Sequence, residues 1–252
     1  MSSSARLGPR ALVAAAATLL ALTCTSSAPS GRPAPASTEA SPPPPVAPEL
    51  ARVPELALVR SPCNGTCPMD LLIVRADGSA LYWGLEHVER VGAYTGWAPR
   101  HLVGTLAARV VEDELATLDL IYDSRRTHGP IDTLGLVLDG ERHVIKNRDR
   151  AAPEPVASLT EALVGLLAGV RWDPEPLAEL ERPDAPACAR LRERVADACT
   201  GYATGDYGPA HCLLYAPLVD RVNHNPVAPE LCEALVDSYD LSPPTPGAGV
   251  GA

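Results

Sequence analysis

The chain has 252 residues, a hydrophobic fraction of 46% and a formal net charge of −10, so it can bury a sizeable core. Phenylalanine is absent and aromatic residues make up only 4%, so this core must consist mainly of leucine, valine and alanine. Lys146 is the only lysine, and no basic stripe with interleaved aromatic residues occurs. This composition argues against a nucleic-acid partner.

The first 24 residues have the order of a secretory signal. Arg6 and Arg10 give a positive start, and residues 11–22 form an apolar run. Thr23 and then Cys24 follow this run. The run is shorter than the roughly 20 apolar residues that cross a bilayer, so we interpret residues 1–24 as a signal peptide and not as a membrane span. The sequence therefore predicts export.

The same stretch resembles a bacterial lipoprotein signal over residues 6–24. The resemblance implies that Cys24 is lipidated and that the protein contacts a membrane through this N-terminal lipid. Because no acidic residue directly follows Cys24, it also implies an outer-membrane anchor, with the protein facing the periplasm or the cell surface. Ordinary cleavage near Ala28, which would release a secreted protein, is the alternative.

Residues 25–50 are rich in proline, alanine and serine, with four consecutive prolines at 42–45. Proline fixes φ and removes amide donors, so we expect no packed core here. In the polyproline form, at about 3.1 Å per residue, about 25 such residues reach on the order of 80 Å. We interpret this segment as a tether.

Antiparallel strands are predicted after the tether. The apolar runs 56–60, 71–74 and 80–83 are typical of strands, and Asp77-Gly78 between the last two is a strong hairpin signal. We expect a further strand over residues 87–94.

Two helices and a second hairpin follow. Apolar residues at steps of three and four predict one helix after Pro99 and another after Pro153. Asp139-Gly140 lies between the apolar runs 134–138 and 143–145. The predicted fold class for residues 51–174 is therefore α+β, an antiparallel sheet with two helices packed on one face.

This domain resembles a bacterial domain-of-unknown-function family, number six-four-three-eight, over about residues 56–173. The residues that carry the resemblance are Pro62, Cys63, Gly65, Cys67, Pro68, Asp77, Gly78, Tyr82, Trp83, Gly84, Val91, Gly92, Asp132, Asp139, Gly140 and Trp172. The chain has Asn64 and Asp70 where the resemblance leads us to expect aromatic side chains. The resemblance implies an envelope location and no particular chemistry.

Cysteines beyond Cys24 number six, which in an oxidising compartment predicts three disulfides. Gly65 lies within a short turn that lets Cys63 pair with Cys67. A zinc site is the alternative, because metal-binding pairs use a similar spacing. No second pair of ligands stands nearby, so we favour the disulfide and expect no metal or cofactor.

Residues 187–241 predict a small, disulfide-linked helical annex. Cys188 and Cys199 share one face of a predicted helix, where about 1.5 Å per residue separates them by roughly 16 Å, too far for a disulfide. We therefore favour pairing Cys188 with Cys232 and Cys199 with Cys212. The crossed pairing, Cys188 with Cys212 and Cys199 with Cys232, stays open.

The regions around the annex complete the domain organisation. A proline-bearing acidic stretch from Pro174 to Pro186 predicts a linker, which suggests that residues 51–174 fold without the annex. We expect a disordered tail over residues 242–252, which are rich in proline, glycine and alanine.

Candidate sites are few, and each has a structural explanation. His211 beside Cys212 has the composition of a thiol–imidazole pair, but a disulfide would remove the nucleophile. His128 with Asp123, Arg125 and Arg126 offers an anion site, although a solvated loop explains the same residues.

Tyr82 and Trp83 alternate across a strand. One of them can face a ligand, or both can pack within the sheet.

No catalytic motif occurs, so we assign no catalytic residue. We predict an exported, membrane-tethered envelope lipoprotein that acts as a non-catalytic binding or structural module, with an envelope protein or a glycan as partner. The alternative is an unrecognised envelope hydrolase or a thiol- or metal-dependent enzyme.

Overall fold

A computed structural model describes residues 47–124, 126, 128–178, 186–200, 210–225 and 227–242. The predicted signal peptide 1–24 with Cys24, the tether up to residue 46, and the tail from residue 243 lie outside the described residues. The described residues form one compact unit. In the described ranges, no helix combines the length and the apolar character needed to cross a membrane.

The centre of this unit is an eight-stranded sheet with the order β5-β7-β6-β1-β2-β3-β4-β8. All neighbouring strands are antiparallel except β5 and β7, which are parallel. The strands are β1 Glu55–Ser61, β2 Met69–Arg75, β3 Ser79–Glu86, β4 Gly92–Trp97, β5 Ile121–Tyr122, β6 Ile131–Leu138, β7 Glu141–Arg148 and β8 Arg171–Trp172.

Both predicted Asp-Gly hairpins are present, between β2 and β3 and between β6 and β7. Gly78 and Gly140 have φ of 96° and 86°, values that a residue without Cβ adopts at low cost. The strand predicted over residues 87–94 is shorter than expected. Residues 87–91 form a loop, which begins at His87 with φ of 53°, and β4 starts only at Gly92.

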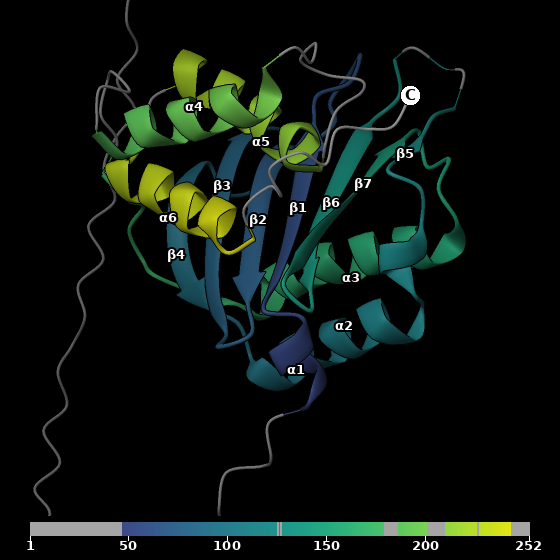
Figure 1. Cartoon of the computed structure of the whole chain (residues 1–252). Coiled ribbons are helices and arrows are strands. Elements are labelled where there is room, and N and C mark those ends of the chain that lie inside the picture. The colour runs from purple at the N-terminus through teal and green to yellow at the C-terminus, as the bar shows by residue number, and fades with distance from the viewer. Residues whose placement is uncertain are drawn as a thin grey trace, which may run out of the picture. The chain divides into compact units, whose positions relative to one another are not determined.

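Helices cover both faces of the sheet (Figure 1). The helices are α1 Glu49–Arg52, α2 Arg100–Glu112, α3 Glu154–Gly169, α4 Pro186–Cys199, α5 Ala210–His224 and α6 Pro229–Asp240, with a 3₁₀ turn at Leu115–Thr117. On one face, α2 and α3 pack with α1 over an apolar cluster that includes Leu58, Leu72 and Leu163. The predicted α+β fold with two long helices on one face is confirmed.

The annex helices α4, α5 and α6 lie on the opposite face of the sheet. They share one apolar cluster with the strands, which joins Val59, Ile73 and Trp83 to Leu214 and Leu235. The annex is therefore part of the same core as the sheet. This packing differs from the arrangement that the linker suggests, in which residues 51–174 fold without the annex.

The cysteine pairs are those that the sequence favours. Cys63 pairs with Cys67, and in the annex Cys188 pairs with Cys232 and Cys199 with Cys212, at Cα–Cα distances of 5.6, 4.9 and 5.5 Å. The two annex bridges join α4 to α6 and to α5. Among the described residues, no group of three or more His, Cys, Asp or Glu side chains is arranged to hold a metal ion.

A buried polar network fixes α6 on the sheet. Glu55 and Arg142, whose side chains are both 0% exposed, form an ion pair of 3.1 Å. Ser238 on α6 donates from Oγ to Glu55 Oε1 at 2.6 Å, and its carbonyl accepts from Arg142 Nη2 at 2.6 Å. Tyr215 OH lies 2.7 Å from Ser238 Oγ, which extends the network to α5.

Arg221 fixes α5 at the ends of β1 and β2. Its Nη2 donates to the Arg60 carbonyl at 2.9 Å and to Ser61 Oγ at 3.1 Å, and its Nη1 donates to the Asp70 carbonyl at 3.4 Å. Burial lowers the pKa of Arg221 to about 10, so the guanidinium stays charged at neutral pH. These bonds replace water at strand-end carbonyls that the annex covers.

Truncation after Asp173 tests whether the sheet needs the annex. We expect the truncated protein to lose its cooperative unfolding transition, because Val59, Ile73, Trp83 and the Glu55–Arg142 pair would become exposed. Thermal unfolding followed by circular dichroism, with the full-length chain as reference, measures this. A truncated protein that unfolds cooperatively near the full-length midpoint would contradict the shared core.

Candidate functional site

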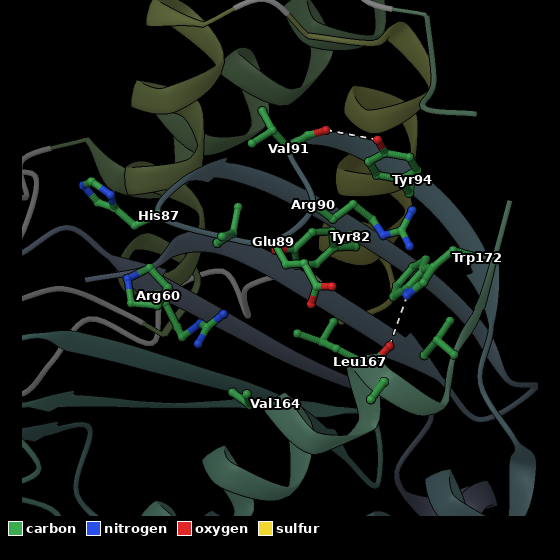
Figure 2. Close-up of a pocket in the computed structure, with 14 residues that line it drawn as sticks. Arg60, Tyr82, His87, Glu89, Arg90, Val91, Tyr94, Val164, Leu167 and Trp172 are labelled. Atoms are coloured by element: carbon green, nitrogen blue, oxygen red, sulfur yellow. Dashed lines mark hydrogen bonds between the residues drawn. The ribbon is translucent and has the colours of Figure 1, made fainter. Parts of the chain in front are cut away.

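A pocket of about 790 Å³ opens on the face of the sheet that carries α2 and α3 (Figure 2). Its lining comes from the end of β1, the middle of β3 and β4, the loop 87–91, the last turns of α3 and the short strand β8. These segments are far apart in the chain. The sheet brings them together because β1, β2, β3, β4 and β8 are successive neighbours in it.

Three aromatic side chains form one wall of the pocket. Tyr82 and Tyr94 are directly opposite each other in the β3–β4 register, and the ring centroid of Trp172 lies 5.7 Å from that of Tyr82. The indole Nε1 of Trp172 donates to the Leu167 carbonyl at 3.1 Å, which joins β8 to the end of α3 (Figure 2). The wall is therefore fixed on regular structure and not on a free loop.

Neither Tyr82 nor Trp83 is an exposed strand residue. Their side chains alternate across β3 as expected, but Tyr82 is 4% exposed and Trp83 is 1% exposed. Trp83 packs in the cluster beneath the annex, whereas Tyr82 lies on the pocket side. From the sequence, one of the two side chains could have faced solvent. In the structure, the elements that cover both faces of the sheet bury both of them.

The loop 87–91 forms the facing wall. It returns across Gly84, where an added Cβ would lie 1.9 Å from the Arg90 carbonyl oxygen, so only glycine permits this approach. Tyr94 OH donates to the Val91 carbonyl at 3.1 Å. The guanidinium of Arg90 lies 4.8 Å above the centre of the Tyr94 ring. These contacts hold the loop against β3 and β4.

An ion pair closes the end of the pocket at β1. Arg60 Nε donates to Asp70 Oδ1 at 2.7 Å, and Nη2 donates to Oδ2, so the pair is bidentate. Asp70 is 2% exposed and also accepts from Tyr82 OH at 3.0 Å. Burial and the Asp70 carboxylate raise the pKa of Tyr82, so its hydroxyl stays protonated as a donor.

A second carboxylate flanks Arg60. Asp132 on β6 is opposite Arg60 in the strand register. Burial raises the pKa of Asp132, although the nearby Arg60 and Arg150 guanidinium groups oppose this shift. Asp70, one of the two positions at which the chain departs from the resembled family pattern, thus belongs to a row of charges that orients Arg60.

Most candidate residues from the sequence lie elsewhere. All six described cysteines form disulfides, and none lines the pocket. His211 is on α5 and is buried within the annex, where its Nε2 contacts the Ser242 carbonyl and burial lowers the pKa of the imidazole. With Cys212 bonded to Cys199, these residues offer no thiol–imidazole pair.

The loop 122–130 does not form an anion site in the described residues. Asp123 pairs with Arg148 at 3.2 Å, and Arg126 pairs with Asp149 at 3.4 Å. Arg125 lies outside the described residues, and His128 is exposed. The described charges Asp123 and Arg126 are therefore engaged by neighbouring side chains, as in the solvated-loop interpretation.

The pocket and its charged residues were not predicted from the sequence. Arg60, Glu89, Arg90 and Tyr94 carry no motif, because their proximity depends on strand pairing and on the return of one loop. A signal was nevertheless present in the family resemblance. The following residues both carry that resemblance and line the pocket: Pro68, Tyr82, Val91 and Trp172.

A second pocket of about 330 Å³ lies between β3, β4 and α6. Its arginine, Arg75, already pairs with Glu55 at 3.4 Å and donates to the Ala234 carbonyl at 3.3 Å. Because this side chain serves the annex interface, we regard the larger pocket as the candidate functional site.

Replacement of Gly84 tests how the facing wall is built. We expect Gly84→Ala to lower the free energy of unfolding by about 1–3 kcal/mol, because the new Cβ meets a backbone oxygen that cannot rotate away. Gly165→Ala on α3 is the control, since no atom lies within 4 Å of its added Cβ. We expect the control to gain about 0.5–1 kcal/mol. Chemical denaturation measures both, and equal stability of Gly84→Ala and wild type would refute the close approach.

A comparison with protein-family models finds that residues 54–167 match the family described as domain of unknown function DUF6438. The match spans β1 to nearly the end of α3, and thus strands β1 to β7 and the two long helices, whereas β8 with Trp172 lies beyond it. A search of curated proteins finds no match. The expected resemblance to this family is confirmed by the match over residues 54–167.

Proposed function

We propose that this protein is an exported, membrane-tethered binding module of the cell envelope, and that its pocket receives a compact group of the partner. The signal pattern ending at Cys24 and the proline-rich segment support export and tethering. Three disulfides in the described residues are consistent with an oxidising compartment.

The observation that carries this proposal is the pocket of about 790 Å³ with aromatic and apolar walls and a few charged side chains. Ligand sites generally have this composition and a volume of about 300–1,000 Å³. The described cysteines are all paired, so none of them supplies a thiolate for catalysis. These features favour binding over the alternative of a thiol-dependent enzyme.

An envelope glycan or an envelope protein is the partner that the sequence leads us to propose. A pocket of this size takes one compact group of such a partner, for example a sugar ring or a side chain, while the rest stays outside. The tether would place the pocket at a distance from the membrane, within reach of material in the envelope.

The tether is tested by Cys24→Ser. We expect this variant to leave the membrane fraction, because a serine cannot carry the lipid that anchors the protein. Fractionation of cells followed by immunoblotting measures the distribution, and Thr25→Ser is the matched control that should stay with the membranes. A Cys24→Ser protein that remains membrane-bound to the wild-type extent would contradict lipid tethering.

The pocket is tested by filling it. Ala168 on α3 lines the pocket and is exposed, so Ala168→Trp should block the site at little cost in stability. Ala189→Trp, at an exposed position on α4, is the control. We expect the wild type and the control to capture the same partner from solubilised envelope fractions, and the blocked variant to lose it, as measured by quantitative mass spectrometry. Undiminished capture by Ala168→Trp, or no specific capture by the wild type, would refute the proposed function.

A further inference from the structure

We infer that the group bound in the pocket is an uncharged saccharide ring. It stacks on Trp172 and forms hydrogen bonds with the charged side chains at the rim, which are Arg60, Glu89 and Arg90. This inference rests on the proposed function, because it names the ligand class of the same pocket. Three independent properties of the lining lead to it: the state of the aromatic polar atoms, the balance of charge, and the mixture of donors and acceptors.

The polar atoms of all three aromatic residues are already engaged within the protein. Tyr82 OH donates to Asp70, Tyr94 OH donates to the Val91 carbonyl, and Trp172 Nε1 donates to the Leu167 carbonyl. The hydrogen-bond donors of these rings are therefore not free for a ligand, and the rings offer it mainly their apolar surfaces. The Arg90 guanidinium covers one side of Tyr94, and Tyr82 is 4% exposed, which leaves the partly exposed Trp172 as the principal platform.

The charges around the pocket nearly cancel. Arg60 is neutralised by the buried Asp70, and Glu89 stands beside Arg90 on the same loop. A pocket for a strongly anionic or cationic ligand would present an excess of one sign. The lining instead favours a ligand without net charge.

The rim supplies both donors and an acceptor for hydrogen bonds. Nε and Nη2 of Arg60 are held by Asp70, and among the hydrogen bonds of the described residues none uses its Nη1. Arg90 is a further donor, and the carboxylate of Glu89 is an acceptor. In Figure 2, Arg60, Glu89 and Trp172 surround the same space between α3 and the loop 87–91.

A pyranose ring matches this combination of surfaces. Its C–H face is apolar and packs on an aromatic ring, while its equatorial hydroxyls both donate and accept hydrogen bonds at the edge. A proline-rich peptide also stacks on aromatic side chains, but its rings have no donors for Glu89. The charged rim therefore favours the saccharide.

The test is titration of the full exported domain with neutral trisaccharides of the chito-, cello-, malto- and manno-series, and with a decaproline peptide. We expect at least one trisaccharide to shift the NMR signals of the Trp172 indole and of the loop 87–91 amides. Calorimetry should give an affinity that changes less than about twofold between low and high salt, because no net charge is involved.

Two variants and one control assign the site. Trp172→Leu should weaken trisaccharide binding by about tenfold or more, and Glu89→Ala, at an exposed position that does not support the fold, should weaken it by about fivefold or more. Trp97→Leu removes a tryptophan that is 52% exposed and does not line this pocket, so binding should stay within about twofold of wild type.

Each contrary result has a distinct meaning. Binding of decaproline but of no trisaccharide would overturn the saccharide inference and leave the pocket as a binding site. Trisaccharide binding that Glu89→Ala leaves unchanged would overturn the assigned rim contacts. If no trisaccharide binds while Ala168→Trp still abolishes partner capture, the inference fails and the proposed function stands.

Discussion

The central constraint on this structure is that the middle strands of the sheet are apolar on both faces. In β1, Leu56 and Leu58 pack against α2 and α3, while Ala57 and Val59 pack against the annex. Such a sheet is stable in water only between two layers of helices, because either bare face would expose a continuous apolar surface. The annex is thus required by the strands themselves. The family match ends before it, yet the sheet within that match already has the face that the annex covers.

Apolar contact alone would not hold three short helices in one position on the sheet, because it is not directional. The disulfides fix α4 to α5 and α6, and buried polar groups fix the helices to the strands. Glu55 and Arg142 are desolvated together, so the cost of burying them is offset only when Ser238 arrives with its hydroxyl and carbonyl. A displaced annex would deprive this pair of its hydrogen bonds to Ser238, which penalises alternative positions of α6 on the sheet.

Local signals made most of the fold predictable. The hairpins followed from Asp77-Gly78 and Asp139-Gly140, the long helices from their apolar periodicity, and the annex disulfide pairs from the helical face that Cys188 and Cys199 share. The docking of the annex was not predictable in this way, because it depends on contacts such as Glu55 with Ser238 that are 183 residues apart. The pocket was not predictable either, because its lining also comes from segments far apart in the chain. In addition, the loop 87–91, with apolar Val88 and Val91, has the composition of a strand. Its actual path depends on Gly84, whose missing Cβ admits the Arg90 carbonyl.

The annex and the pocket, which lie on opposite faces of the sheet, both contact the adjacent ends of β1 and β2. There, Arg221 of the annex binds the carbonyls of Arg60 and Asp70, while the side chains of these same two residues form the charged end of the pocket on the opposite face. The annex thus holds the backbone from which the pocket's bidentate ion pair projects. A fixed backbone at this point keeps the Arg60 side chain at the pocket, and the ion pair with Asp70 lowers the entropic cost of ordering this side chain on binding. The annex therefore has a role beyond covering an apolar face, because it preorganises a site that it does not touch.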